Sequence, residues 1–223
     1  DHALSVPFLH TGSLSLEEQF YFFFPIFLIF IFKFFKKYLF ISILICFVIS
    51  LSLSQYSSSV YKSLTFYMLP FRGWELLAGS LVAYFKIYLI NGSKINYNNF
   101  FSNILIFSSF FIIILYFFFF NGNFSHPSFY TFFLILSVSI IICFDKNQNL
   151  ITKFLSTKFL IAFGLISYSL YLWHYPLFAF ARHIHGPHFE EMISLKLLII
   201  SISIILSIFT YYFIEKTFRK TNL

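Results

Sequence analysis

The chain contains seven long apolar runs, and this pattern restricts its fold more than any other feature. A helix needs about 20 mainly apolar residues to cross the roughly 30 Å hydrocarbon core of a membrane. Of the 223 residues, 59% are hydrophobic and only 10% are charged, whereas soluble domains carry about 25% charged residues. Such a composition is incompatible with a water-exposed surface, so the runs predict membrane-spanning segments. They cover residues 16–35, 38–53, 71–90, 100–120, 129–144, 159–181 and 192–214.

The predicted fold class is all-α, a polytopic transmembrane helix bundle of about seven spanning helices in one domain. Hydrocarbon offers backbone N–H and C=O groups no partner, and the polar alternation of barrel strands is absent. Cys46 and Cys143 lie inside apolar runs, so we expect small core residues, with neither a disulfide nor a metal site. The net charge of +7 forms no basic stripe, so no nucleic-acid partner is predicted.

The distribution of Lys and Arg predicts the orientation, because cytoplasmic loops are enriched in these residues. With the N-terminal end of the first segment outside, eleven of the 15 cationic residues fall inside and four outside. This favours a multi-pass chain with its N-terminal end outside and its C-terminus in the cytoplasm. The inner set is Lys33, Lys36, Lys37, Lys86, Lys94, Lys146, Lys153, Lys158, Lys216, Arg219 and Lys220, and the outer set is Lys62, Arg72, Arg182 and Lys196.

Ionisable residues inside apolar segments are costly, so each is a candidate for function or for internal pairing. Glu17 and Glu18 open the first segment, where carboxylates also complement the positive end of a helix dipole. Glu17 shares a helical face with Tyr21 and is the better candidate to point into the bundle. Arg72 and Glu75 are one turn apart near the outer end of the third segment, either as a self-neutralising pair or as a substrate anchor.

The sixth segment carries a polar face. Ser167, Tyr171 and His174 fall at i, i+4 and i+7, so a hydroxyl, a phenol and an imidazole lie on one side of the helix. At about 1.5 Å per residue, His174 lies in the outer half of the bilayer, at the level predicted for Glu17 and Arg72. We therefore expect a carboxylate, a cation and an imidazole from three helices to converge on one outer cavity. Beyond this helix, residues 182–188 contain three His, which favour a polar outer loop over a metal site.

These stretches resemble the acyltransferase-3 family of membrane O-acyltransferases, which modify bacterial surface carbohydrates. Residues 9–21, Leu-His-Thr-Gly-Ser-Leu-Ser-Leu-Glu-Glu-Gln-Phe-Tyr, resemble the family's His-Thr-Trp-Ser-Leu-Ser-Val-Glu-Glu-Gln-Phe-Tyr signature. Residues 72–79 resemble its Arg-x-x-Glu-Leu-x-x-Gly element, and residues 164–176 its Gly-x-x-Ser-Tyr-x-x-Tyr-Leu-x-His-x-Pro element. Residues 212–219 are similar to the Phe-Ile-Glu-x-x-Phe-Arg ending found where a periplasmic SGNH-type domain follows.

The resemblance implies an O-acyltransferase, most simply an acetyltransferase, of the bacterial inner (plasma) membrane. Acyl-CoA, such as acetyl-CoA, would be the donor substrate with no permanently bound cofactor. The acceptor would be a hydroxyl of a lipid-linked or exported carbohydrate, as in O-antigen or other lipopolysaccharide modification. Membrane lipid and a fused or separate SGNH-type domain would be the other partners. The implied catalytic residues are His174, Glu17, Arg72 and Glu75, and the implied substrate-binding residues are Tyr171, Ser167, Tyr21 and Trp173.

Two departures from the family pattern affect this expectation. Gly12 stands where the signature has Trp, which removes an aromatic surface. The family also has ten helices, and its first carries an Arg and a His that nothing here matches. We therefore expect residues 1–223 to be an acyltransferase-3 transmembrane domain without its N-terminal helices. The alternatives are a transporter or flippase for a sugar or lipid, which would show similar polar residues, and a non-catalytic remnant.

Overall fold

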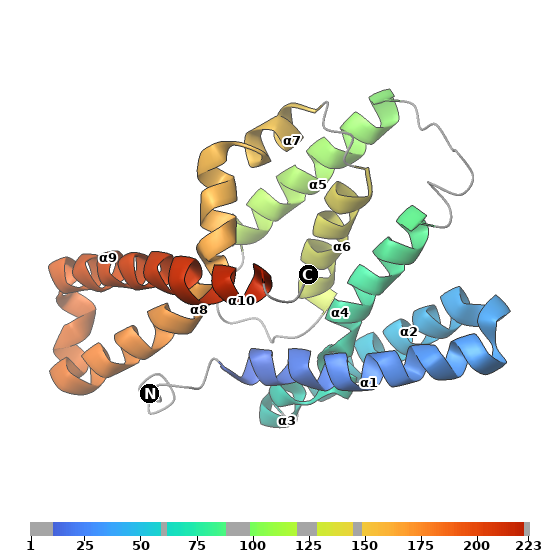
Figure 1. The fold of residues 1–223 in the computed structure, drawn as a ribbon, viewed down its shortest axis with the longest axis horizontal. Coiled ribbons are helices and arrows are strands. Elements are labelled where there is room, and N and C mark those ends of the chain that lie inside the picture. Colours follow the sequence, from blue (N-terminus) through green and yellow to red (C-terminus); the bar gives the residue numbers. More distant parts are fainter. Residues whose placement is uncertain (1–10, 59–61, 88–98, 120–128, 145–148, 221–223) are drawn as a thin grey trace. The chain divides into compact units, whose positions relative to one another are not determined.

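The computed structural model describes residues 11–58, 62–87, 99–119, 129–144 and 149–220. Every regular element in these ranges is helical (Figure 1). The chain divides into two compact units, each described by itself. We call Ser13–Phe154 the N-terminal unit and Leu155–Leu223 the C-terminal unit.

In its described residues, the N-terminal unit has three long helices, two of intermediate length and two short ones. A 3₁₀ turn, Lys36–Tyr38, precedes α2. The helices are α1 (Gly12–Phe34), α2 (Leu39–Ser57), α3 (Lys62–Tyr67), α4 (Leu69–Tyr84), α5 (Asn99–Phe119), α6 (Phe129–Phe144) and α7 (Leu150–Leu155).

The C-terminal unit is a helix pair closed by a tight turn. Helix α8 (Lys158–His185) ends at Gly186, whose φ of 57° lies in the left-handed region that glycine adopts without a Cβ penalty. A 3₁₀ segment, Gly186–Glu191, leads into α9 (Ile193–Thr210), which lies along α8 in Figure 1. A π-helical segment, Tyr211–Glu215, and α10 (Lys216–Lys220) complete the unit.

All seven apolar runs are confirmed as helical over the residues that the structure describes, and residues 88–90 and 120 lie outside them. The ends of the helices differ from the predictions by a few residues. The third helix begins at Leu69, two residues before its predicted start, and so includes Pro70, which is tolerated in the first turn of a helix. Within the described ranges, four segments are long and apolar enough to span a membrane by length and composition, and α6 is a shorter apolar helix. The spanning candidates are Gly12–Phe34, Lys36–Ser57, Phe100–Phe119 and Ile193–Arg219.

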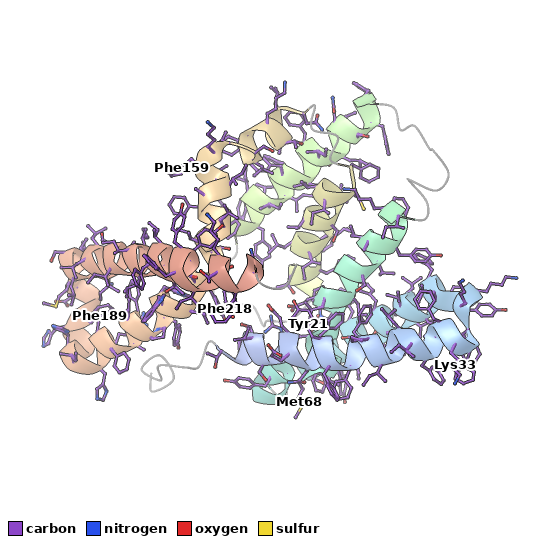
Figure 2. All side chains as sticks on the ribbon, in the orientation of Figure 1. Tyr21, Lys33, Met68, Phe159, Phe189 and Phe218 are labelled. Carbon is purple, nitrogen blue, oxygen red and sulfur yellow. The ribbon has the colours of Figure 1, made fainter. Side chains whose placement is uncertain are left out.

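Large apolar side chains project outward from most of these helices (Figure 2). On α5, for example, Phe117 and Phe118 are 75% and 79% exposed. Water would not solvate such a surface, whereas lipid tails are as apolar as the side chains themselves. The helices therefore have the surface of a membrane protein.

Helices α2 and α4 pack closely through small residues. The Ser50 hydroxyl accepts a 3.0 Å hydrogen bond from the backbone N–H of Trp74, and a Cβ built on Gly73 would lie 3.6 Å from the same hydroxyl oxygen. Trp74 is fully buried and contacts the rings of Phe47 and Phe132. Small residues at a helix crossing allow this approach, which fixes where the first turn of α4 lies.

Hydrogen bonds at the helix ends show the relative directions of α2, α4 and α6. The Gln55 side chain, near the end of α2, accepts from the backbone N–H of Phe129, the first residue of α6. Lys86, just beyond α4, donates to the carbonyl of Ile142 near the end of α6. Thus α4 and α6 end together, while α2 ends where α6 begins, as an up-and-down bundle requires. Which end faces outward stays a prediction from the charges.

We expect Gly73→Leu to lower the free energy of unfolding in detergent by about 1–3 kcal/mol, because a large side chain must displace Ser50 or Leu69. Gly79→Leu is the matched control, since nothing lies within 4 Å of a Cβ there. Equal stability of the two variants would contradict the close α2–α4 packing.

Candidate functional site

A cavity of about 600 Å³ lies between α8 and α9 in the C-terminal unit. Ser167, Tyr171 and His174 line it from α8, so the three residues do share one face, as their spacing predicts. Ser203 adds a buried hydroxyl from α9, and the remaining wall is apolar. The cavity therefore presents a few polar groups in apolar surroundings, as ligand pockets commonly do.

His174 is held by a hydrogen bond that fixes its tautomer. Its Nδ1 lies 3.0 Å from the carbonyl oxygen of Leu170, one turn earlier in α8. A carbonyl only accepts, so Nδ1 carries the proton, and in the neutral ring Nε2 is the nitrogen with the basic lone pair. The ring centroid is 5.8 Å from that of Tyr171. The arrangement is that of a base oriented by the backbone.

The opposite side of α8 carries a second set of polar groups, which join it to the end of α9 and the π-helical segment. The Trp173 indole donates to Thr210 Oγ1 at 2.9 Å, and Ser169 donates to Glu215 Oε2 at 3.3 Å. Glu215 also pairs with Arg219 at 3.3 Å. Trp173 thus contacts α9 and does not line the cavity, and its predicted role in substrate binding stays a prediction.

Arg72 and Glu75 form a two-pronged ion pair on α4 in the N-terminal unit. Arg72 Nη2 and Nε lie 2.9 and 3.2 Å from the two carboxylate oxygens, and the side chains are 10% and 18% exposed. The guanidinium carbon also lies 5.2 Å from the ring centroid of Phe66 on α3. The carboxylate and the ring together fix the guanidinium, and Nη1 keeps its two N–H donors outside the pair.

Helix α1 supplies Glu17 and Tyr21 to the same unit. Glu17 is half-buried and Tyr21 is 62% exposed. Within the described ranges, no hydrogen bond or ion pair joins Glu17 to Arg72 or Glu75. His174 lies in the other unit, so the convergence of these residues on one cavity stays a prediction.

Sequence reasoning missed Gln19, although it lies between Glu17 and Tyr21. Its side-chain amide donates to the carbonyl of Tyr67 at 3.1 Å and accepts from the N–H of Leu69 at 3.2 Å. This ties the start of α1 to the start of α4, so Glu17 and Arg72 lie toward the same end of the N-terminal unit. The sequence signal of such a contact was weak, because Gln19 follows Glu17 and Glu18 in the polar start of α1.

The His-rich stretch expected as a loop, residues 182–188, begins inside α8, because His183 and His185 belong to the last turn of that helix. His185 Nδ1 lies 3.1 Å from the carbonyl oxygen of Ala181. Over the part of the chain that the structure describes, no group of three His, Cys, Asp or Glu side chains is placed to hold a metal ion.

Comparison with known proteins finds relatives that are named O-acetyltransferases. The chain is 30% identical to "Putative O-acetyltransferase SACOL0978" of Staphylococcus aureus strain COL over 98% of its own length and 37% of that protein. It is also 30% identical to O-acetyltransferase OatA of Staphylococcus aureus strain NCTC 8325, over 96% of this chain and 36% of that protein. The chain thus spans little more than a third of these relatives. It is similar to O-acetyltransferases. No protein-family model and no solved structure matches it.

The buried ion pair gives a stability prediction. Glu75→Ala leaves the Arg72 guanidinium buried without its counter-charge, and we expect a loss of about 3 kcal/mol in unfolding free energy. Replacing both residues by apolar ones, Arg72→Met with Glu75→Leu, should restore most of that loss, because no unpaired charge then remains. Chemical denaturation in detergent measures both, and a double variant as unstable as Glu75→Ala would contradict the pairing.

Proposed function

We propose that this chain is the transmembrane part of an acyltransferase-3 type O-acyltransferase. It would move an acetyl or other short acyl group from acyl-CoA to a hydroxyl of a lipid-linked or cell-surface carbohydrate. The observation that carries this proposal is the α8–α9 cavity, in which a backbone-oriented imidazole, two serine hydroxyls and a phenol line one largely apolar pocket. The similarity to O-acetyltransferases over nearly the whole chain supports the same reaction.

Ester formation needs a base and a stabilised oxyanion. A sugar hydroxyl is a weak nucleophile near neutral pH, so a positioned group must take its proton as the oxygen attacks the thioester carbonyl. In the proposed reaction the new C–O bond forms, the C–S bond breaks, and coenzyme A leaves as the thiol with the proton returned to sulfur. His174 acts as an accessory base or as an orienting group for the hydroxyl, through Nε2.

The ion pair of α4 provides the complementary charge. Arg72, held by Glu75 and Phe66, anchors an anionic group of the acceptor through its remaining N–H donors. Glu17 orients the sugar hydroxyls or an imidazole, while Tyr171, Ser167, Tyr21 and Trp173 contact the substrate.

The protein is proposed to act in the bacterial plasma membrane. The described N-terminal end would face outward and the C-terminus the cytoplasm, where acyl-CoA is available. A fused or separate SGNH-type domain is a further proposed partner, on the resemblance of residues 212–219 to the Phe-Ile-Glu-x-x-Phe-Arg element.

The test is transfer of radiolabel. The protein, as its gene encodes it, is reconstituted in lipid vesicles with [¹⁴C]acetyl-CoA and cell-wall or O-antigen polysaccharide. Base-labile label in the polysaccharide supports the proposal, whereas a transporter or flippase would move the carbohydrate without forming this bond.

We expect His174→Ala to lower the rate of acylation by about 10²–10⁴-fold, the range for loss of a general base. His185→Ala is the matched control, because its ring makes the same bond to a carbonyl four residues earlier and does not line the cavity. Membrane insertion of both variants is checked by fractionation. Full activity of His174→Ala would remove this residue from the reaction.

A further inference from the structure

The junction between α3 and α4 is a break in the helical backbone. Helix α3 ends at Tyr67, Met68 has extended angles of φ −100° and ψ 131°, and α4 begins at Leu69 (Figure 2 labels Met68). Backbone groups beside such a break have no partner within the helices. Gln19 supplies both partners from α1, by donating to the Tyr67 carbonyl and accepting from the Leu69 N–H.

An amide can make this pair of hydrogen bonds at neutral pH, whereas a carboxylate cannot. A carbonyl oxygen only accepts and a backbone N–H only donates, so the bridging side chain must present one donor and one acceptor. The same requirement fixes which way the Gln19 amide points. A carboxylate at this position would place a negative oxygen against the Tyr67 carbonyl, whereas a protonated carboxyl group could donate to it.

The break at Met68 lies about one helical turn before Arg72 in the chain. Its guanidinium touches Phe66 on the α3 side of Met68 and Glu75 on the α4 side. A change of angle at Met68 would therefore move the ring and the carboxylate relative to one another. The geometry of the guanidinium depends on how firmly that junction is held.

We propose that Gln19 is a positioning residue for Arg72, acting by locking the α3–α4 junction. The inference rests on the proposed function, in which Arg72 anchors an anionic group of the acceptor. Gln19 itself touches no substrate. Gln19 keeps the Arg72 guanidinium in place before the acceptor binds. Loss of Gln19 therefore weakens acceptor binding more than it slows the chemical step.

The experiment compares three variants in the reconstituted protein. Gln19→Leu removes both hydrogen bonds, and Gln19→Glu keeps the acceptor but loses the donor at neutral pH. Gln55→Leu is the matched control, because that glutamine joins a different helix pair, α2 and α6, by a bond to the Phe129 N–H. Four quantities are measured: kcat, KM for the acceptor, the unfolding temperature, and hydrogen exchange at the Leu69 amide.

For Gln19→Leu we expect KM for the acceptor to rise about tenfold with kcat changed less than twofold, and exchange at Leu69 to accelerate. Gln19→Glu should show the same rise in KM at neutral pH. As the pH is lowered, KM should fall again, because protonation of the carboxylate restores the hydrogen-bond donor. Gln55→Leu should leave KM and Leu69 exchange unchanged.

Two results would overturn the positioning role while leaving the enzyme assignment intact. One is a wild-type KM in Gln19→Leu despite faster exchange at Leu69, and the other is an equal loss in Gln55→Leu. A wild-type protein that transfers no label would instead overturn the proposed function, and the positioning role with it.

Discussion

Hydrocarbon offers no hydrogen-bond partner, and this constraint organises the polar groups of both units. Serines within the apolar helices donate to carbonyls one turn earlier, as Ser137 does to Phe133 and Ser203 does to Ile199. Where a helix starts or breaks, a distant amide side chain supplies the missing partner, Gln55 at α6 and Gln19 at α4. Lys86 donates to a carbonyl near the end of α6 in the same way. Many of the contacts between helices are therefore side-chain hydrogen bonds to backbone groups that lack a partner within their own helix.

The same constraint prepares the candidate functional groups. The bond from His174 to Leu170 holds the imidazole and selects its tautomer before any substrate arrives. Arg72 is neutralised by Glu75 through two hydrogen bonds, which lowers the cost of keeping a guanidinium in apolar surroundings. In each case the interaction that lowers the free-energy cost of a polar residue in apolar surroundings also orients its side chain. Preorganisation of this kind is what acyl transfer would use.

Periodicity and composition were sufficient for the long helices, because each apolar run is close to the length that a membrane requires. The short helices α3, α7 and α10 escaped prediction, since five or six residues carry too little pattern to distinguish a helix from a loop. Spacing also predicted the shared face of Ser167, Tyr171 and His174. It could not predict that Gln19 bonds residues 48 and 50 positions away, because that contact depends on how α1 docks on α4.

Helix α8 carries polar groups on two opposite sides. One side, with Ser169 and Trp173, is joined to the end of α9 and the following π-helical segment. The other side lines a cavity whose remaining wall is apolar. Hydroxyl and imidazole groups are desolvated there, and the backbone offsets part of that cost, since Ser167 donates to the Gly164 carbonyl and His174 Nδ1 lies 3.0 Å from that of Leu170. The bonds that satisfy these groups in a membrane therefore also hold them on the cavity wall.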